Sequence, residues 1–196
     1  MIRARVCAVW VFVATIFLAQ SALAHDGQTG GFLTGLSHPV SGLDHIAAMI
    51  AVGLWGSQLR KPAVWLLPVV FPMVMAFGAF LALIGLGLPG VEIGIALSAV
   101  VLGAMVMMEI KPPLAVSVVF VSFFAVFHGQ AHGTELPANQ NSLVYSVGFV
   151  VSTGLLHALG ITVGTIHHWR GGPVVVRALG GAIVAGGLYF LFGAIG

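Results

Sequence analysis

Histidines and carboxylates in two otherwise apolar segments are the residues of this chain best suited to chemistry. The segment HPVSGLDHIAAMIAVG contains His38, Asp44 and His45, and the segment FHGQAHGTE contains His128, His132 and Glu135. An ionisable side chain is costly inside lipid, by roughly 2.5 to 3.5 kcal/mol for an Asp at the centre of a spanning helix, so such residues indicate a functional site. Imidazole nitrogens combined with carboxylate oxygens indicate a site for a divalent transition metal ion.

The composition places both segments in a membrane protein. Hydrophobic residues make up 59% of the 196 residues, charged residues make up 6%, and the mean hydropathy is +1.11. These values are typical of bilayer proteins rather than of soluble domains. The chain has only seven Lys and Arg residues, and no cluster of them is dense enough to predict nucleic-acid binding.

Residues 1–24 are predicted to be a cleavable secretory signal peptide. Arg3 and Arg5 precede an apolar run over residues 6–19, and an A-x-A site follows at residues 22–24. A basic start, a short apolar run and small residues at the cleavage site are the three parts of such a signal, and the run is short for a membrane span. An uncleaved first helix is the alternative.

Cleavage would leave residues 25–196 as a single transmembrane domain. Its first residue would be His25, whose amine and imidazole could chelate a metal ion. Cleavage would also remove Cys7, which is the only cysteine, so the mature chain would have no thiolate ligand. Donors of nitrogen, oxygen and thioether type suit Ni2+, Co2+, Cu2+ or Zn2+ rather than Cu(I).

Hydropathy and the positions of Pro and Gly predict an all-α, polytopic membrane protein with six transmembrane helices. The helices are expected at residues 39–59, 63–86, 91–110, 113–132, 142–168 and 173–195. The connection at residues 133–141 is the only one with room for structure of its own. Divalent ions and membrane lipid are the expected partners, and no oligomeric state is predicted.

The basic residues of the mature chain predict its orientation. They all fall in or beside alternate connections, on one side of the membrane: Arg60, Lys61, Lys111, Arg170 and Arg177. The positive-inside rule makes that side cytoplasmic, so the mature N-terminus and the C-terminus are expected in the periplasm. The two polar segments would then share the periplasmic end of the bundle, where carboxylates and imidazoles without fixed positive charge would concentrate cations.

The first segment is predicted to begin a helix near Pro39, with His38 as its cap. His45 follows His38 by seven residues, close to two turns, so both rings are expected on one face of the helix. Asp44 would be offset by about 100° and still reach a shared ion. Alternatively, Asp44 only caps the first turn. Met49, one turn further, either offers a thioether or packs in the core.

The second segment presents His128 and His132 at i, i+4 on one helix face, a common way to offer two imidazoles to one metal. The end of that helix carries the negative pole of its dipole, which favours a cation, and Glu135 follows it. Glu92, at the start of the third helix, either attracts cations or is a favourable first-turn acid. His157, in the fifth helix, is a permeation relay, a proton carrier or a hydrogen-bonded core histidine.

HPVSGLDHIAAMIAVG together with FHGQAHGTELP resembles the HupE/UreJ family of bacterial nickel permeases. The resemblance implies a secondary-type permease that moves Ni2+, or in some members of the family Co2+, across the inner (plasma) membrane into the cytoplasm for metalloenzyme assembly, with no permanently bound cofactor. The resemblance also implies which residues bind the metal ion: His38, Asp44, His45, His128, His132 and Glu135, and also Glu92. The first motif is one residue longer than the H-x4-D-H signature of the wider nickel/cobalt transporters.

Two properties of such a permease follow from the sequence. Ligand histidines must be neutral to bind, so uptake is expected to fall as the pH drops below about 6.5. The chain contains no G-x4-G-K-[ST] phosphate loop, so transport is expected to be passive, potential-driven or ion-coupled.

Two other classes of protein use similar residues. An intramembrane zinc metallohydrolase would hold a non-exchanging metal with the same His/Asp set and would need a lateral opening for its substrate. A haem-binding electron carrier would need histidine pairs at matched depth.

Overall fold

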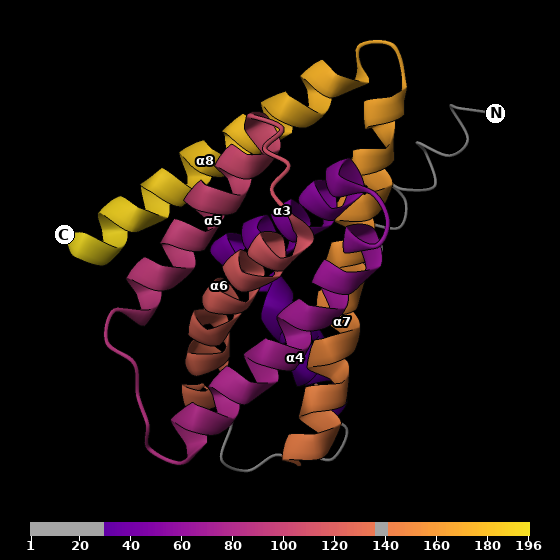
Figure 1. The fold of residues 1–196 in the computed structure, drawn as a ribbon. Helices are drawn as coiled ribbons and strands as arrows, with labels where there is room; N and C mark the ends of the chain where they lie inside the picture. The colour runs from indigo at the N-terminus through magenta and orange to yellow at the C-terminus, as the bar shows by residue number, and fades with distance from the viewer. Residues whose placement is uncertain (1–29, 136–140) are drawn as a thin grey trace.

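The structure, a computed structural model, describes residues 30–135 and 141–196, and every regular element in these ranges is a helix (Figure 1). In chain order the elements are α2 (Gly30–Ser37), η1 (His38–Val40), α3 (Leu43–Leu59), α4 (Ala63–Leu83), α5 (Val91–Met107), α6 (Leu114–Thr134), α7 (Ser142–Gly164), η2 (Thr165–His168) and α8 (Gly172–Ile195). The prediction of an all-α protein is confirmed. The predicted signal peptide and His25 lie outside the described residues.

Helices α3 to α8 correspond one by one to the six predicted spans, but they do not all qualify as spans by length. Four of them, α4, α6, α7 continued by η2, and α8, are long and apolar enough to cross a membrane. Residues 31–40 and helix α3 form a pair bent by 78°, which would count as a fifth, broken span. Helix α5 has 17 residues, about 26 Å, where roughly 20 residues are needed for a straight crossing. The described chain therefore has four or five candidate spans, and a sixth stays a prediction.

Helix α3 is the central helix of the bundle. Its residues from Met49 to Gln58 are buried almost without interruption, and α4, α5, α7 and α8 all pack against it. Around it, α4 lies along α6, α5 along α8, and α2 along the first turns of α7 (Figure 1). A helix that is apolar on all sides is expected to be surrounded by protein or lipid, and here protein surrounds it.

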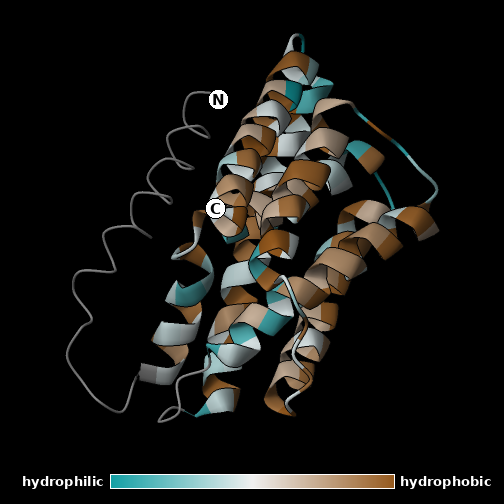
Figure 2. Cartoon of the chain, turned by 90° about the vertical axis from the view of Figure 1, so that its left-hand side faces the viewer, coloured by the Kyte–Doolittle hydropathy of each residue, from teal (hydrophilic) through white to brown (hydrophobic). Residues whose placement is uncertain are grey.

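The outer faces of the surrounding helices are apolar. Helix α4 exposes Val69, Met73, Phe77 and Phe80 along one stripe, and no described part of the chain covers them. Brown, hydrophobic residues cover most of the length of the long helices in Figure 2. An exposed apolar surface of this extent is typical of helices that face lipid.

Glycines set the distance between the helices of two pairs. Gly129 of α6 lies against the backbone of α4 at Met75, and Gly53 of α3 lies against the backbone of α7 at His157 and Gly160. A Cβ atom at Gly129 or Gly53 would overlap a carbonyl oxygen of the facing helix. Close packing of small residues is a main source of helix association in lipid, so these contacts fix how α6 and α7 stand beside α4 and α3.

The basic residues gather at one end of the bundle. There Arg177 Nε donates to the Met107 carbonyl oxygen at 2.9 Å, and His167 Nδ1 lies 3.9 Å from Glu109 Oε1. The connections at this end contain the other basic residues of the described chain, Arg60, Lys61, Lys111 and Arg170. The opposite end contains the two polar segments, so the predicted separation of charge along the bundle is present in the fold.

Candidate metal site

The two polar segments meet at the end of the bundle opposite the basic residues. The ring centroid of His45, in the first turn of α3, lies 4.6 Å from that of His132 and 4.8 Å from that of His128. The i, i+4 spacing on α6 places His128 one turn deeper than His132 and turns both rings toward α3. Residues more than eighty positions apart in the chain therefore form one cluster.

His38 reaches this cluster by a different route from the one predicted. It begins the 3-10 turn η1, and α3 starts only at Leu43, after Gly42 in an extended conformation (φ −103°, ψ 119°). The prediction that His38 caps the helix of His45 is therefore wrong, because the chain bends by 78° between them. The bend itself brings the His38 ring to 4.9 Å from the His132 ring.

His38, His132 and Glu135 form the outermost part of the cluster. His38 Nε2 lies 2.9 Å from Glu135 Oε2, and His132 Nδ1 lies 3.8 Å from the same oxygen. Each residue offers one ligand atom, and these atoms lie within 4.8 Å of one another, a grouping that no other three His, Cys, Asp or Glu side chains make within the described chain. Small side-chain rotations would bring two nitrogens and one oxygen to the 2.0 to 2.2 Å typical of bonds to a divalent transition metal.

Asp44 orients His45. One oxygen of its carboxylate, Oδ1, accepts hydrogen bonds from the His45 backbone N–H (2.8 Å) and from His45 Nδ1 (2.9 Å). The ring hydrogen is therefore on Nδ1, and the lone pair is on Nε2. His45 Nε2 is buried and has no hydrogen-bond partner among the described residues. A carboxylate that holds a histidine in this way is the usual support of a metal-binding imidazole.

Ser98 of α5 orients His128 in the same manner. Its hydroxyl donates to the Ile95 carbonyl oxygen at 2.6 Å, so its oxygen must accept the hydrogen of His128 Nε2, which lies 2.9 Å away. The lone pair of His128 is consequently on Nδ1, which is buried and unpaired in the described part of the chain. His45 and His128 thus both have a buried nitrogen lone pair without a hydrogen-bond partner among the described residues.

A polar cavity opens at the cluster. Its lining consists of His38, Ser41, Gly42, Asp44, His45, Glu92, Ala131, His132 and Glu135. Three carboxylates and no Lys or Arg line this cavity, so its potential favours cations. Glu92 stands in the first turn of α5 and also faces this cavity, so its two predicted roles are compatible.

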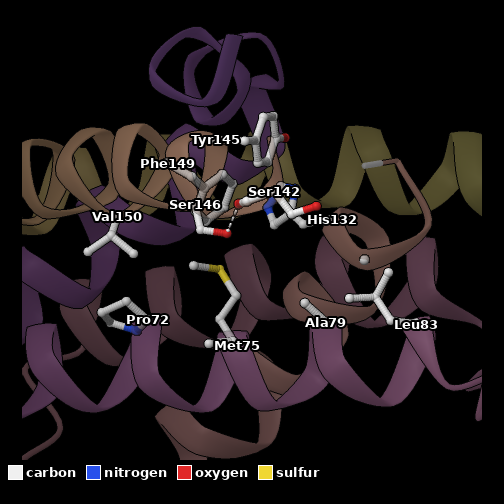
Figure 3. Close-up of a pocket in the computed structure, with 12 residues that line it drawn as sticks. Pro72, Met75, Ala79, Leu83, His132, Ser142, Tyr145, Ser146, Phe149 and Val150 are labelled. Carbon is white, nitrogen blue, oxygen red and sulfur yellow. Dashed lines mark hydrogen bonds between the residues drawn. The ribbon is translucent and has the colours of Figure 1, made fainter. Parts of the chain in front are cut away.

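A second cavity lies beside the cluster, between α4, α6 and α7. Figure 3 shows Met75, Ala79 and Leu83 on one of its sides and His132 with Phe149 on the other. Among its lining residues His132 is the only candidate metal ligand, and its ring packs 4.4 Å from that of Phe149. This cavity therefore offers an apolar wall to the site but no second set of ligands.

Three further residues are placed by the structure. Met49 is fully buried in the hydrophobic core, which favours the packing role over the thioether ligand. Gln130, which lies between the two histidines of its motif, donates to the carbonyl oxygens of Gly78 and Leu86 and ties the α4–α5 connection to α6. Sequence reasoning missed Gln130 and Ser98, because only the fold shows which groups their side chains meet.

Two comparisons relate the chain to known proteins. A family model described as HupE / UreJ protein matches residues 13–190. A protein named "Protein HupE", from Rhizobium leguminosarum bv. viciae, is 44% identical over 182 residues, which cover 92% of this chain and 95% of that protein. No solved structure matches the chain.

Proposed function

We propose, because this chain belongs to the HupE/UreJ family of metal permeases, that it is a secondary-type permease for Ni2+ and, as a second cargo, Co2+. In this proposal the ion moves across the bacterial inner membrane into the cytoplasm and supplies metalloenzyme assembly. The family is not a family of enzymes, so the alternative of a zinc metallohydrolase is set aside.

The observation that carries the proposal is the convergence of His38, His132 and Glu135 on one point below a cavity rich in carboxylates. Carboxylates at the mouth would attract a hydrated divalent ion, and the two imidazoles would replace part of its water. Imidazole and carboxylate donors suit Ni2+ and Co2+. Three protein ligands leave coordination positions for water, and an incomplete shell of this kind also allows release.

The next candidate ligands, His45 and His128, lie deeper in the bundle than His38 and Glu135 and close to His132. The His45 ring lies 4.6 Å from His132 and 4.8 Å from His128, centroid to centroid. The rings of His45 and His128 are each held by a hydrogen bond on one nitrogen and have a free lone pair on the other. We infer that the ion passes from His132 to His45 and then to His128. An ion that keeps one ligand while it gains the next avoids full desolvation.

The expected driving force is the membrane potential. A doubly charged ion that moves into a negative interior gains about 4.6 kcal/mol per 100 mV, twice the single-charge value. The proposal places the carboxylate-lined mouth in the periplasm and the end with Arg60 and Lys61 in the cytoplasm, with both termini of the mature chain outside. Six spans and cleavage after residue 24 complete this topology.

Accumulation of radiolabelled Ni2+ by cells that produce the protein tests the proposal. Wild-type cells are expected to accumulate Ni2+ above cells with an empty vector, and Glu135→Gln is expected to abolish most of that uptake. Glu109→Gln is the matched control, because it makes the same change at the opposite end of the bundle, outside the candidate site. Unlabelled Co2+ should compete, and uptake no higher than the vector control would overturn the proposal.

A further inference from the structure

A second polar group lies deeper in the bundle, on the inward face of α7. Thr153 and His157 are one helical turn apart, with 0% and 1% of their surface exposed. The two ring nitrogens of His157 and the hydroxyl oxygen of Thr153 have no hydrogen-bond partner within the described residues. These three atoms point into the interior of the bundle rather than to lipid.

Unpaired polar atoms at such depth are unusual, because buried donors and acceptors in proteins are almost always satisfied. A histidine kept only for packing would be expected to form at least one hydrogen bond, and the described part of the chain offers His157 none. The backbone of His157 is also held in place, since its carbonyl oxygen lies against Gly53 of α3. A ligand that is present for part of the time would account for atoms that are otherwise left unpaired.

One aromatic ring, that of Phe71, contacts both this pair and the outer cluster. Phe71 of α4 is fully buried, and its centroid lies 5.3 Å from that of His128 and 5.5 Å from that of His157. Both contacts are edge-to-face, with interplanar angles of 62° and 79°. The Phe71 ring therefore contacts both the innermost imidazole of the outer cluster and the imidazole of α7.

We propose that His157 and Thr153 form an inner binding position for the transported ion, reached from His128 when the Phe71 ring turns aside. The inference rests on the proposed function for the nature of the cargo, a divalent transition metal ion. An imidazole nitrogen and a hydroxyl oxygen would hold the ion together with water that travels with it. No carboxylate belongs to this position, so the ion is held loosely and leaves readily toward the basic end.

The first test uses the full-length chain reconstituted in lipid vesicles with an inside-negative potential. His157→Leu is expected to lower Ni2+ flux at least tenfold, while the apparent affinity for Ni2+ at the mouth changes less than threefold. Thr153→Val, which keeps the shape of the side chain, is expected to lower flux several-fold. Thr162→Val is the matched control on the exposed face of the same helix and should transport normally. A His157→Leu protein with wild-type flux would overturn the proposal.

A second test detects metal bound at the inner position by its absorption spectrum, and this readout does not depend on transport. His157→Cys, made in a Cys7→Ser background, introduces the only thiol in the chain. Addition of Co2+ should then produce a thiolate-to-cobalt charge-transfer band that the Cys7→Ser parent lacks, and the ratio of Cd2+ to Ni2+ flux should rise at least tenfold, since thiolate favours the softer ion. Absence of the band would overturn the inner position. Absence of Ni2+ flux in the parent, with the band present, would overturn the proposed function alone.

Discussion

Replacing Asp44 by Asn tests whether this carboxylate acts on the ion through His45. The structure shows a single oxygen, Oδ1, that accepts both hydrogen bonds from His45, one from the backbone and one from the ring. Asn has an oxygen in the same place, so Asp44→Asn keeps the shape and both acceptor contacts. It removes only the negative charge that supports the ring hydrogen and the bound cation.

The size of the effect follows from these two bonds. A hydrogen bond to a charged group contributes about 1.5 to 3 kcal/mol, against about 0.5 to 1.5 kcal/mol for a neutral pair. Only the ring bond changes the lone pair that His45 offers to the ion, so about 1 to 2 kcal/mol of binding free energy should be lost. That loss corresponds to a Kd for Ni2+ raised roughly 5- to 30-fold, which overlaps the roughly 10- to 100-fold loss seen when a group that supports a metal-binding histidine is removed.

Equilibrium dialysis of the purified protein against radiolabelled Ni2+ measures this Kd. Ser98→Ala is the matched comparison, because it removes the corresponding support of His128 without a change in charge. Its neutral hydrogen bond should be worth less, so we expect Kd to rise by about tenfold or less.

Either of two results would refute the reasoning about Asp44. A Kd within about threefold of wild type would mean that the charge of the carboxylate does not support His45. A loss of more than about 1,000-fold, equivalent to about 4 kcal/mol, would mean that Asp44 is itself bonded to the ion. The second result would restore the direct-ligand role that the sequence predicted for it.

Three further predictions concern packing, pH and charge. Gly129→Ala should lower the stability of the detergent-solubilised protein by about 1 to 3 kcal/mol, because its Cβ would press on the α4 backbone, whereas Gly154→Ala, which meets nothing, should be neutral in a thermal unfolding assay. Uptake at constant free Ni2+ should fall as the pH is lowered, since protonated imidazoles cannot bind the ion, and uptake that stays constant over the whole acid range in which the protein remains folded would exclude histidine ligands. Ser41→Lys would place a positive charge in the mouth, and it should slow Ni2+ capture at low ionic strength more than at high ionic strength.

Much of the fold was predictable because apolar runs, prolines and glycines divide the chain clearly. The long helices from α3 to α8 lie where the hydropathy pattern predicted them. Helix α2 was not predicted, since its sequence GGFLTGLS has three glycines and weak helix propensity. It is stabilised by packing on α7, where Gly35 lies against the Tyr145 backbone. The bend at Gly42 was missed because the spacing of His38 and His45 also fits a continuous helix.

The sequence was sufficient to predict which residues form the candidate site, but not which side chains form hydrogen bonds to them or pack against them. Histidines and carboxylates in an apolar chain stand out, so the outer cluster could be named from the sequence. Ser98 could not, because it lies thirty residues from His128 and serines are common in such helices. The contact of Phe71 with two imidazoles is equally invisible in the sequence, since one phenylalanine among 13 has no distinguishing pattern.

The donors change in kind with depth, and this change fits a route better than a storage site. Along the proposed route carboxylates occur only at the mouth, where Glu92 and Glu135 are exposed. Deeper in, His128 and His157 are neutral donors with almost no exposed surface. A buried carboxylate beside a divalent ion would form a strong, poorly solvated pair, and separating that pair would be costly. Imidazoles bind the same ion without a net charge of their own, so each inner step can be reversed, and an ion drawn in by the charged mouth can continue to the other side.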